Sequence, residues 1–285
     1  TVDKFGDILV TQTMSLGLEK VKPLVFPLLV QAMEKDGQPI RGIYERNDGK
    51  LRELEGLEQG KGWFPLEGRP TPESTVTEIV ENGIRYRVDF ENGQKTGFFL
   101  DQKYNRVAAA KIAPGRRVLD CFTHTGSFGL NCKKAGAAQV VSVDVSDTAI
   151  AQAKENAALN GLSVEYQTAN VFDLLPTLTP GQFDYIILDP PAFTKSGKTV
   201  DSAQRGYKEI NYRAMKALPR GGYLATCSCS HFMTDALFRK MLHAAARDAQ
   251  VELRLVEARA QAPDHPVLWT VPETDYLKFY IFQVV

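Results

Sequence analysis

The chain has 285 residues, which is enough for one large domain or two, and 44% of them are hydrophobic, which permits a sizeable core. Lysine plus arginine and aspartate plus glutamate both number 34, so the formal net charge is zero and the chain has no global basic surface for nucleic acid. No apolar run approaches the roughly 18 residues of a membrane span and no signal peptide is evident, so we expect neither a membrane protein nor a secreted one.

The first hundred residues predict a small mixed α/β unit. Residues 7–14 have the pattern of a strand, and residues 40–45 have the pattern of another. Between them, residues 18–32 have the spacing of an amphipathic helix. We expect this helix to be interrupted at Pro23 and Pro27, because proline lacks the backbone N–H that a helix needs.

The remainder of this unit predicts a loop and a hairpin. Residues 53–72 are rich in Gly, Glu and Pro, which indicates an acidic loop. Residues 75–80 and 84–90 alternate between apolar and polar side chains on either side of Asn82-Gly83. An Asn-Gly pair between two such runs is a strong signal for a tight β-hairpin.

From residue 103 onward the pattern becomes regular. A helix is expected over residues 103–112, ended by Pro114-Gly115. Further strands are expected near 117–121, 139–143, 163–168, 184–189, 222–228, 252–258 and 276–284, with helices near 126–134, 146–159, 203–218 and 233–248. This alternation is typical of a mostly parallel α/β sheet covered on both faces.

No helix is predicted between the last two strands, which allows the final strand to insert antiparallel. A seven-stranded sheet with this ending is the usual class I methyltransferase architecture, a Rossmann-like α/β fold. We therefore predict a small α/β domain over residues 1–106 and a methyltransferase domain over residues 107–285.

Residues 117–129 predict a buried strand that ends on an acid, then a tight turn and the start of a helix. Such turns bind ligands at the carboxyl edge of a parallel sheet. A dinucleotide site would need G-x-G-x-x-G, and only Gly126 and Gly129 are present. Asp120 instead offers a negative charge to a ligand with an ammonium group, such as S-adenosylmethionine, and Asp144 ends the next strand, suited to ribose hydroxyls. The alternative is a plain βαβ unit whose acids only cap helices.

A second acid follows an apolar strand at Asp189, and Pro190 and Pro191 come directly after it. Proline fixes its own φ and restricts the residue before it, so Asp189 would be held rigidly at the sheet edge. Phe193 is close enough in sequence to stack on a flat ring such as a nucleobase. The alternative is a stiff structural turn.

The four cysteines, at positions 121, 132, 227 and 229, lack the spacing of a disulfide framework, which favours a reducing cytoplasm. Residues 221–230 predict a strand that would end beside Asp189. A thiolate there could add to carbon 6 of a cytosine, which makes carbon 5 nucleophilic enough to take a methyl group from a sulfonium. A cysteine in a strand is more often a buried small hydrophobe. Cys227, Cys229 and His231 are too few for a structural zinc site, so we expect no metal.

Six motifs occur in order along the chain, at residues 120–128, 189–193, 205–211, 228–230, 264–266 and 276–278. Together they resemble the bacterial 23S ribosomal RNA large-subunit methyltransferase I family, over nearly the whole chain. That family makes 5-methylcytosine with S-adenosylmethionine, so the resemblance implies the same cofactor and a ribosomal RNA substrate. Its members begin with a PUA-type RNA-binding domain, and because the chain starts at Thr1 and is neutral, we expect that domain to be absent.

The resemblance also implies roles for single residues. The expected cofactor-binding residues are Phe99, Gln102, Asp120, Phe122, Thr125, Gly126, Asp144, Asn170, Val171 and Asp189. Of these, Asp120, Phe122, Thr125 and Gly126 would line the methionine end of the cofactor. Asp144 would hold the ribose, and Asn170 and Val171 would flank the adenine, although relatives often carry Asp where this chain has Asn170. The expected catalytic residues are Cys229, as the nucleophile, and Asp189; Cys227 lies two residues too early.

The target cytidine would be flipped out of its RNA into the site. The expected substrate-binding residues are Pro190, Pro191, Phe193, Lys195, Arg205 and Lys208. The basic residues among them could contact phosphates, although a charge run is usually a solvated face. Ala192 stands where many RNA cytosine-5 methyltransferases carry a second cysteine, so the group that removes the carbon 5 proton stays open.

Three further questions stay open at this point. A guanine-modifying RNA methyltransferase has the same fold and needs no nucleophile, and a noncatalytic RNA-binding scaffold would retain the fold without the chemistry. The sequence does not decide whether the chain forms a homodimer.

Overall fold

The computed structural model describes residues 1–194 and 196–285, which divide into two compact units, residues 1–100 and 101–285. The predicted domain boundary after residue 106 falls inside helix α3 (Lys103–Ile112), and the assignment of residues 1–106 as a domain stays a prediction. In the part of the chain that the structure describes, no helix is long and apolar enough to cross a membrane.

The first unit is built on a four-stranded sheet of order β1-β2-β3-β4, with a separate two-stranded hairpin. The strands are β1 (Val2–Phe5), β2 (Ile8–Thr11), β3 (Gly42–Asn47) and β4 (Gly60–Phe64), and the hairpin is β5 (Val76–Glu81) and β6 (Ile84–Asp89). The hairpin confirms the prediction, because Asn82 and Gly83 join its strands with φ values of 53° and 73°, as a two-residue hairpin turn requires.

Strand β4 corrects the prediction of a loop over residues 53–72. It pairs antiparallel with β3, with Ile43 opposite Phe64. The centroid of the Trp63 ring lies 5.1 Å from that of Tyr44 and 5.6 Å from that of Phe90, and both pairs are arranged edge to face. These aromatic contacts favour an extended strand in spite of the local Gly content.

Helix α1 (Leu16–Lys35) is continuous, so the predicted interruption at Pro23 and Pro27 is wrong. The helix buries Phe26 and Val30 against Leu9 and other residues of the sheet. Each proline in a helix interior costs about 3 kcal/mol. Burial of Phe26 and Val30 contributes about 1.5–3 kcal/mol each, and Leu29 and Met33 of the same helix pack against the same cluster. Tertiary packing therefore outweighs the local signal.

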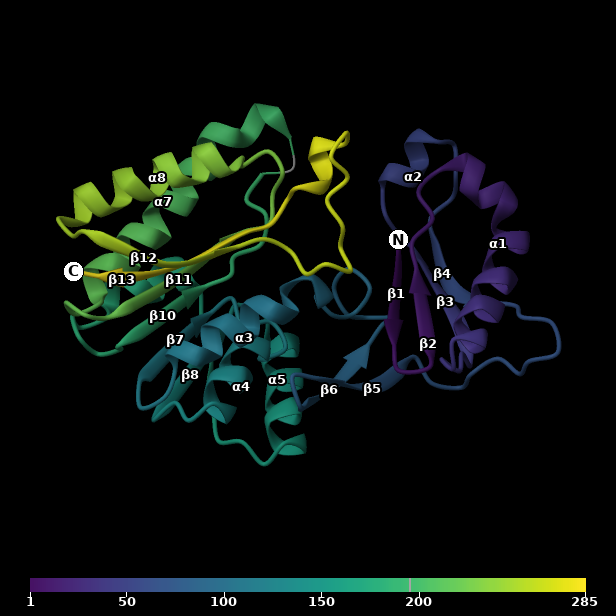
Figure 1. Ribbon diagram of the computed structural model, residues 1–285, viewed down its shortest axis with the longest axis horizontal. Helices are drawn as coiled ribbons and strands as arrows, with labels where there is room; N and C mark the ends of the chain where they lie inside the picture. Colours follow the sequence, from purple (N-terminus) through teal and green to yellow (C-terminus); the bar gives the residue numbers. More distant parts are fainter. Residues whose placement is uncertain (195) are drawn as a thin grey trace. The chain divides into compact units, whose positions relative to one another are not determined.

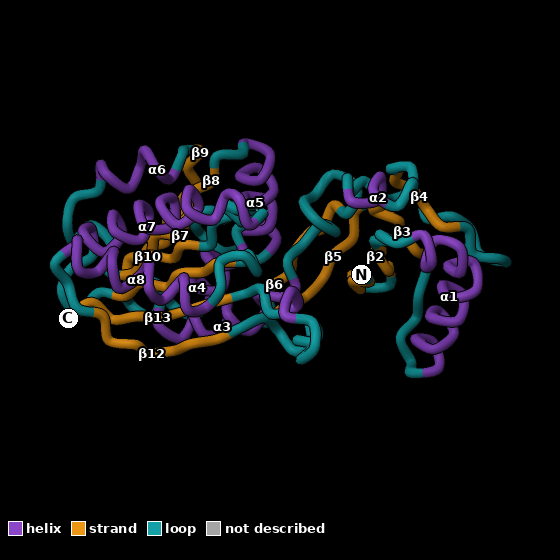
Figure 2. The backbone as a smooth tube through the Cα atoms, turned by 90° about the horizontal axis from the view of Figure 1, so that it is seen from above, coloured by secondary structure: helices purple, strands orange, loops and turns teal. Residues whose placement is uncertain are grey.

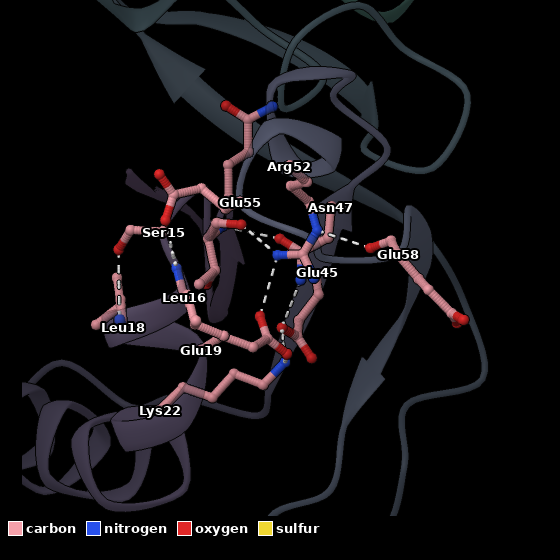
Figure 3. A network of polar contacts seen from close by, with 12 residues as sticks. Ser15, Leu16, Leu18, Glu19, Lys22, Glu45, Asn47, Arg52, Glu55 and Glu58 are labelled. Carbon is pink, nitrogen blue, oxygen red and sulfur yellow. Dashed lines mark hydrogen bonds and ion pairs between the residues drawn. The ribbon is translucent and has the colours of Figure 1, made fainter.

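A polar network joins α1, β3 and the short helix α2 (Leu51–Leu54) in the first unit (Figure 3). Lys22 Nζ lies 2.6 Å from a carboxylate oxygen of Glu19 and 2.7 Å from one of Glu45. The largely buried Arg52 side chain donates to Glu19 at 3.0 Å, and Asn47 donates to Glu45 at 2.7 Å. The network fixes α1 on the sheet, since each buried charge has an opposite charge or an acceptor beside it.

The second unit is a seven-stranded sheet of order β12-β13-β11-β10-β7-β8-β9 (Figure 2). The strands are β7 (Arg117–Cys121), β8 (Gln139–Asp144), β9 (Glu165–Thr168), β10 (Tyr185–Leu188), β11 (Tyr223–Ser228), β12 (Leu253–Arg259) and β13 (Lys278–Val284). The other helices are α4 (Ser127–Lys134), α5 (Asp147–Leu159), α6 (Val171–Leu174), α7 (Val200–Ala217) and α8 (Asp235–Ala249). Strand β13 runs antiparallel to both of its neighbours, which confirms the predicted ending.

Helices cover both faces of this sheet (Figure 1). On one face, α7 and α8 pack Tyr207, Ile210 and Phe238 onto the strands. On the other, α3 and α4 pack Ala109 and Phe128 onto them. The predicted class I methyltransferase fold is thus confirmed, and the carboxyl ends of β7, β8, β10 and β11 meet at one edge.

Candidate functional site

The carboxyl edge of the sheet brings together the acids and the cysteine predicted from sequence. Asp120 and Asp144 lie at the ends of the neighbouring strands β7 and β8, and Asp189 directly follows β10. Cys229 directly follows β11, which pairs in parallel with β10. Four residues up to 109 positions apart in sequence therefore share one edge because the strands run parallel.

Asp120 lies beneath the turn that follows β7, and its side chain is fully buried. Its Oδ2 accepts hydrogen bonds from the Thr123 hydroxyl, from the Gly129 backbone N–H at 2.9 Å and from the Ser142 hydroxyl at 3.2 Å. Its Oδ1 has no partner among the described residues. Burial, opposed by these hydrogen bonds and reinforced by the charge of Asp144, raises the pKa of Asp120 to about 6.

The backbone of this turn is strained, because two residues other than glycine have left-handed φ values. Phe122 has φ +62° and His124 has φ +51°, a region that costs non-glycine residues about 1–2 kcal/mol each. Backbone strain of this kind is often held at ligand-binding sites. Thr125, next in the turn, is buried, and its hydroxyl has no partner among the described residues.

Gly126 ends the turn and caps the N-terminus of α4 with φ +85°. A Cβ at this position would lie 3.0 Å from the Tyr166 hydroxyl and 3.1 Å from the Ala153 Cβ. We therefore predict that Gly126→Ala lowers the free energy of unfolding by about 2–3 kcal/mol, through a left-handed φ together with crowding. Chemical denaturation measures this loss. Gly136→Ala is the matched control, because Gly136 also has positive φ (+99°) but open space around it; an equal loss in both variants would contradict the crowding.

Asp144 is half-buried at the end of β8, and each of its carboxylate oxygens accepts a hydrogen bond from a backbone N–H. One accepts from the His124 N–H at 2.9 Å and the other from the Ser146 N–H at 3.0 Å. A carboxylate oxygen has a second lone pair, so each can still accept from a ligand hydroxyl. Asn170 is exposed at the N-cap of α6, where its side chain accepts from the Phe172 N–H at 3.0 Å, and Val171 is buried behind it.

Asp189 is held by Gln102, which directly precedes α3. Gln102 Nε2 donates to Asp189 Oδ1 at 2.9 Å, and the Gln102 carbonyl oxygen accepts from Asn105 Nδ2 at 2.7 Å. Burial raises the pKa of Asp189 to about 7; the charge of Arg106 opposes this rise and the charge of Asp101 adds to it. Asp189 can therefore hold or release a proton near neutral pH.

Cys229 is half-buried, whereas the other three cysteines, at 121, 132 and 227, are fully buried. Its Sγ lies 3.9 Å from the Pro190 carbonyl oxygen, so the thiol is adjacent to the double proline. Burial raises the pKa of Cys229 to about 12, the charges of Asp189 and Asp101 add to the rise, and Lys278 opposes it. A thiolate here therefore needs a nearby cation or a proton acceptor.

Phe193 belongs to an aromatic cluster. The centroid of its ring lies 4.6 Å from the ring centroid of Tyr207, 5.7 Å from that of Phe172 and 6.5 Å from that of Phe122. The structure thus joins it to Phe122 of the first turn, a contact that the sequence did not indicate. Pro190 is buried and Pro191 is exposed.

The predicted phosphate-contacting residues have differing surroundings. Arg205 is exposed on α7. Lys208, one turn further, is paired with Asp248 at 2.5 Å. Lys195 lies outside the described residues, and Phe99 is half-buried at the end of the first unit. The roles assigned to all of the site residues stay predictions.

The sequence analysis gave no role to two side chains at this edge, Asn105 and Lys278, although Lys278 belongs to the motif at residues 276–278. Asn105 orients Gln102, and it could have been noticed as a polar residue on the buried face of α3. Lys278 begins the last strand and is only 5% exposed. Lys278 could have been noticed because it lies between Leu277 and a run of apolar residues, where a charged side chain is unexpected.

Comparison with known proteins shows the family and the fold. The family model described as S-adenosylmethionine-dependent methyltransferase matches residues 63–282. The chain is 42% identical over 290 residues to a ribosomal RNA large subunit methyltransferase I from Aliivibrio fischeri, covering all of this chain and 71% of that protein. It is 44% identical over 283 residues to the protein of the same name from Photobacterium profundum, covering 98% of this chain and 69% of that one.

Solved structures show the same fold. A putative methyltransferase from Streptococcus mutans superposes with a TM-score of 0.79 at 23% identity, covering 99% of this chain and 70% of that one. A putative methyltransferase crystallised with SAH gives the same TM-score and identity, covering 99% and 71%. Trm5b from Pyrococcus abyssi gives 0.70 at 18% identity, covering 100% and 74%.

Proposed function

The chain belongs to the S-adenosylmethionine-dependent methyltransferases, in the ribosomal RNA large subunit methyltransferase I family, and from this premise we propose that it methylates carbon 5 of a cytidine in ribosomal RNA through Cys229. The observation that carries the proposal is the position of Cys229, the cysteine that is not fully buried, beside Pro190 at the same sheet edge as Asp120, Asp144 and Asp189. A methyltransferase acting on an amine or ring nitrogen would need no such nucleophile.

The residues at this edge fit the cofactor. Asp120 Oδ1 and the Thr125 hydroxyl are buried polar atoms without a partner among the described residues, at the turn expected to face the methionine end. Gly126 has no side chain to obstruct that turn, and Asp144 has lone pairs left for ribose hydroxyls. When bound, S-adenosylmethionine supplies a methyl group carried on a positively charged sulfur.

Asp189 and Phe193 would hold the flipped cytosine. The protonated Asp189 carboxyl can donate a hydrogen bond to ring nitrogen 3, and its pKa of about 7 keeps much of it protonated at neutral pH. Gln102 fixes the orientation of that carboxyl. Hydrogen bonding to nitrogen 3 draws electrons out of the ring and favours attack at carbon 6.

Cys229 performs the covalent step. Its thiolate lone pair forms the sulfur–carbon 6 bond, and the electrons of the carbon 5–carbon 6 double bond make carbon 5 nucleophilic. After carbon 5 has taken the methyl group, the carbon 5 proton leaves to a base. The electrons of that C–H bond restore the double bond, and the sulfur–carbon pair returns to Cys229 as thiolate.

The direct test follows an isotope-labelled methyl group. The chain is incubated with ribosomal RNA that lacks the modification and with labelled S-adenosylmethionine, and the RNA is digested to nucleosides for mass spectrometry. Label in 5-methylcytidine supports the proposal. Label in a guanosine derivative would overturn it and leave the cofactor site intact, and no transfer to any RNA would point to a noncatalytic scaffold.

The cofactor site makes a separate prediction. Asp144→Ala is expected to weaken binding of S-adenosylhomocysteine by roughly 10- to 100-fold, because a hydrogen bond to a charged group contributes about 1.5–3 kcal/mol. Isothermal titration calorimetry measures the change. Asp147→Ala, an exposed residue in the first turn of α5, is the control and should bind normally. Equal affinities of wild type and Asp144→Ala would show that Asp144 does not contact the ribose.

A further inference from the structure

Lys278 is a buried lysine next to the thiol. It begins β13, which pairs antiparallel with β11 so that Lys278 lies opposite Ser228, the residue before Cys229. Its side chain is 5% exposed. Lysine is almost never buried to this degree unless its charge is paired, so the residue calls for an explanation.

The Lys278 nitrogen is held in place by backbone. Nζ donates to the Ser230 carbonyl oxygen at 2.6 Å and to the Tyr276 carbonyl oxygen at 2.8 Å. Within residues 1–194 and 196–285, these two carbonyls are its hydrogen-bond acceptors, and no carboxylate is bonded to it. Two of the three substituent positions on the nitrogen are therefore fixed, and the third carries either a proton or a lone pair.

The thiol and the amine interact electrostatically. The Lys278 charge lowers the pKa of Cys229, and a Cys229 thiolate raises the pKa of Lys278. Burial lowers the pKa of Lys278 to about 8, which the charges of Asp275, Cys229 and Asp235 oppose. The other charges facing Cys229, those of Asp189 and Asp101, disfavour a thiolate. Lys278 thus supplies a positive charge that favours the Cys229 thiolate, at an edge where the neighbouring acids disfavour it.

We propose that Lys278 is the positioning residue that activates Cys229, because its ammonium charge, held beside the residue by the Ser230 carbonyl, stabilises the Cys229 thiolate. When the thiol ionises, the S–H bond breaks, its electron pair stays on sulfur and the proton leaves to solvent water. Lys278 keeps its three N–H bonds, two of which are donated to the carbonyl oxygens of Ser230 and Tyr276. The proposal rests on the proposed role of Cys229 as nucleophile.

The test measures the thiol directly and needs no RNA. Wild type, Lys278→Met and Lys278→Arg are alkylated with iodoacetamide across pH 6 to 10, and mass spectrometry quantifies the modified Cys229. We expect Lys278→Met to be alkylated at least about tenfold more slowly at pH 8, because loss of a neighbouring opposite charge shifts a pKa by about 1–3 units. Lys278→Arg keeps the charge and should stay closer to wild type. Equal pH profiles for wild type and Lys278→Met would overturn the proposal.

A second measurement uses only the wild-type chain and decides the question should Lys278→Met not fold. If the Lys278 charge offsets the burial of Cys229, the alkylation rate should reach half of its maximum near or below the usual thiol pKa of about 8.5. A midpoint more than about one unit higher would contradict the activation.

Methyl transfer separates this proposal from the proposed function. The methylation rate of Lys278→Met should recover as the pH rises, which a merely structural defect would not produce. If the wild-type product is 5-methylcytidine and the alkylation profiles are equal, Lys278 has no activating role while the function stands. If the product is a guanosine derivative, the proposed function fails and the activation of Cys229 for catalysis fails with it.

Discussion

Cys229→Ala is expected to reduce methyl transfer at least about 1,000-fold while leaving cofactor affinity unchanged, because removal of a covalent nucleophile eliminates the reaction path and not the binding site. Single-turnover transfer of labelled methyl to ribosomal RNA measures the rate. Calorimetric titration with S-adenosylhomocysteine measures the affinity.

The covalent adduct provides a second readout of the same prediction. RNA containing 5-fluorocytidine at the target position cannot lose a proton from carbon 5, so the enzyme should remain bonded to it and migrate as a complex on a denaturing gel. Cys229→Ala should form no such complex. Cys227→Ala should still form it, because Cys227 is fully buried two residues earlier and is not placed to attack. An adduct that persists in Cys229→Ala and vanishes in Cys227→Ala would reverse the assignment.

The methyltransferase fold could be predicted from sequence because its signals are local. Each strand from β7 to β11 is a short apolar run, and each helix between them has its own periodicity, so the order of elements follows from the chain. The absence of a helix before β13 likewise indicated an antiparallel ending. The helix over residues 18–32 was predicted, but its interruption at the prolines and the loop in place of β4 were predicted wrongly. Phe26 and Trp63 pack against partners elsewhere in the first unit, and this packing outweighs the local signals of their neighbours.

The site could be predicted only in outline. Acids at strand ends identify the edge, since all parallel strands end there. The contacts between side chains arise from tertiary packing: Gln102 reaches Asp189 across 87 residues, and Lys278 reaches the carbonyl of Ser230 across 48. No local pattern encodes these pairs. The burial of Asp120 was also not foreseen. The sequence shows that an acid lies at the end of a strand, but it does not show whether the turn that follows covers that acid.

Asp120 gives the second prediction of large effect. Asp120→Ala is expected to lower the free energy of unfolding by about 3–5 kcal/mol, because it leaves Thr123, Gly129 and Ser142 with buried donors and no acceptor, at about 1–3 kcal/mol each. Asp120→Asn keeps one carbonyl oxygen for these donors and should retain the fold. Urea denaturation of both variants measures the difference. Equal losses in the two would show that the charge of Asp120, and not its role as acceptor, holds the turn.

The pH dependence of the free energy of unfolding further distinguishes the role of Asp120 as a hydrogen-bond acceptor from the effect of its charge. Because the folded-state pKa of Asp120 is about 6, above the usual 3.8, the folded chain holds a proton between these values that the unfolded chain has released. Its contribution to stability therefore falls as the pH rises from about 4 to 6 and is constant above. A shift of about two pKa units corresponds to roughly 3 kcal/mol. Relative to wild type, Asp120→Asn should accordingly gain about that much stability between pH 4 and pH 7. Burial, the largest cause of the raised pKa of Asp189, is common to both chains, whereas the charge of Asp120 adds to that pKa and is lost in Asp120→Asn. This loss lowers the Asp189 pKa in the variant and therefore changes the difference in the same direction. A difference that does not change with pH would mean that the Asp120 carboxylate is ionised in the folded protein at no cost.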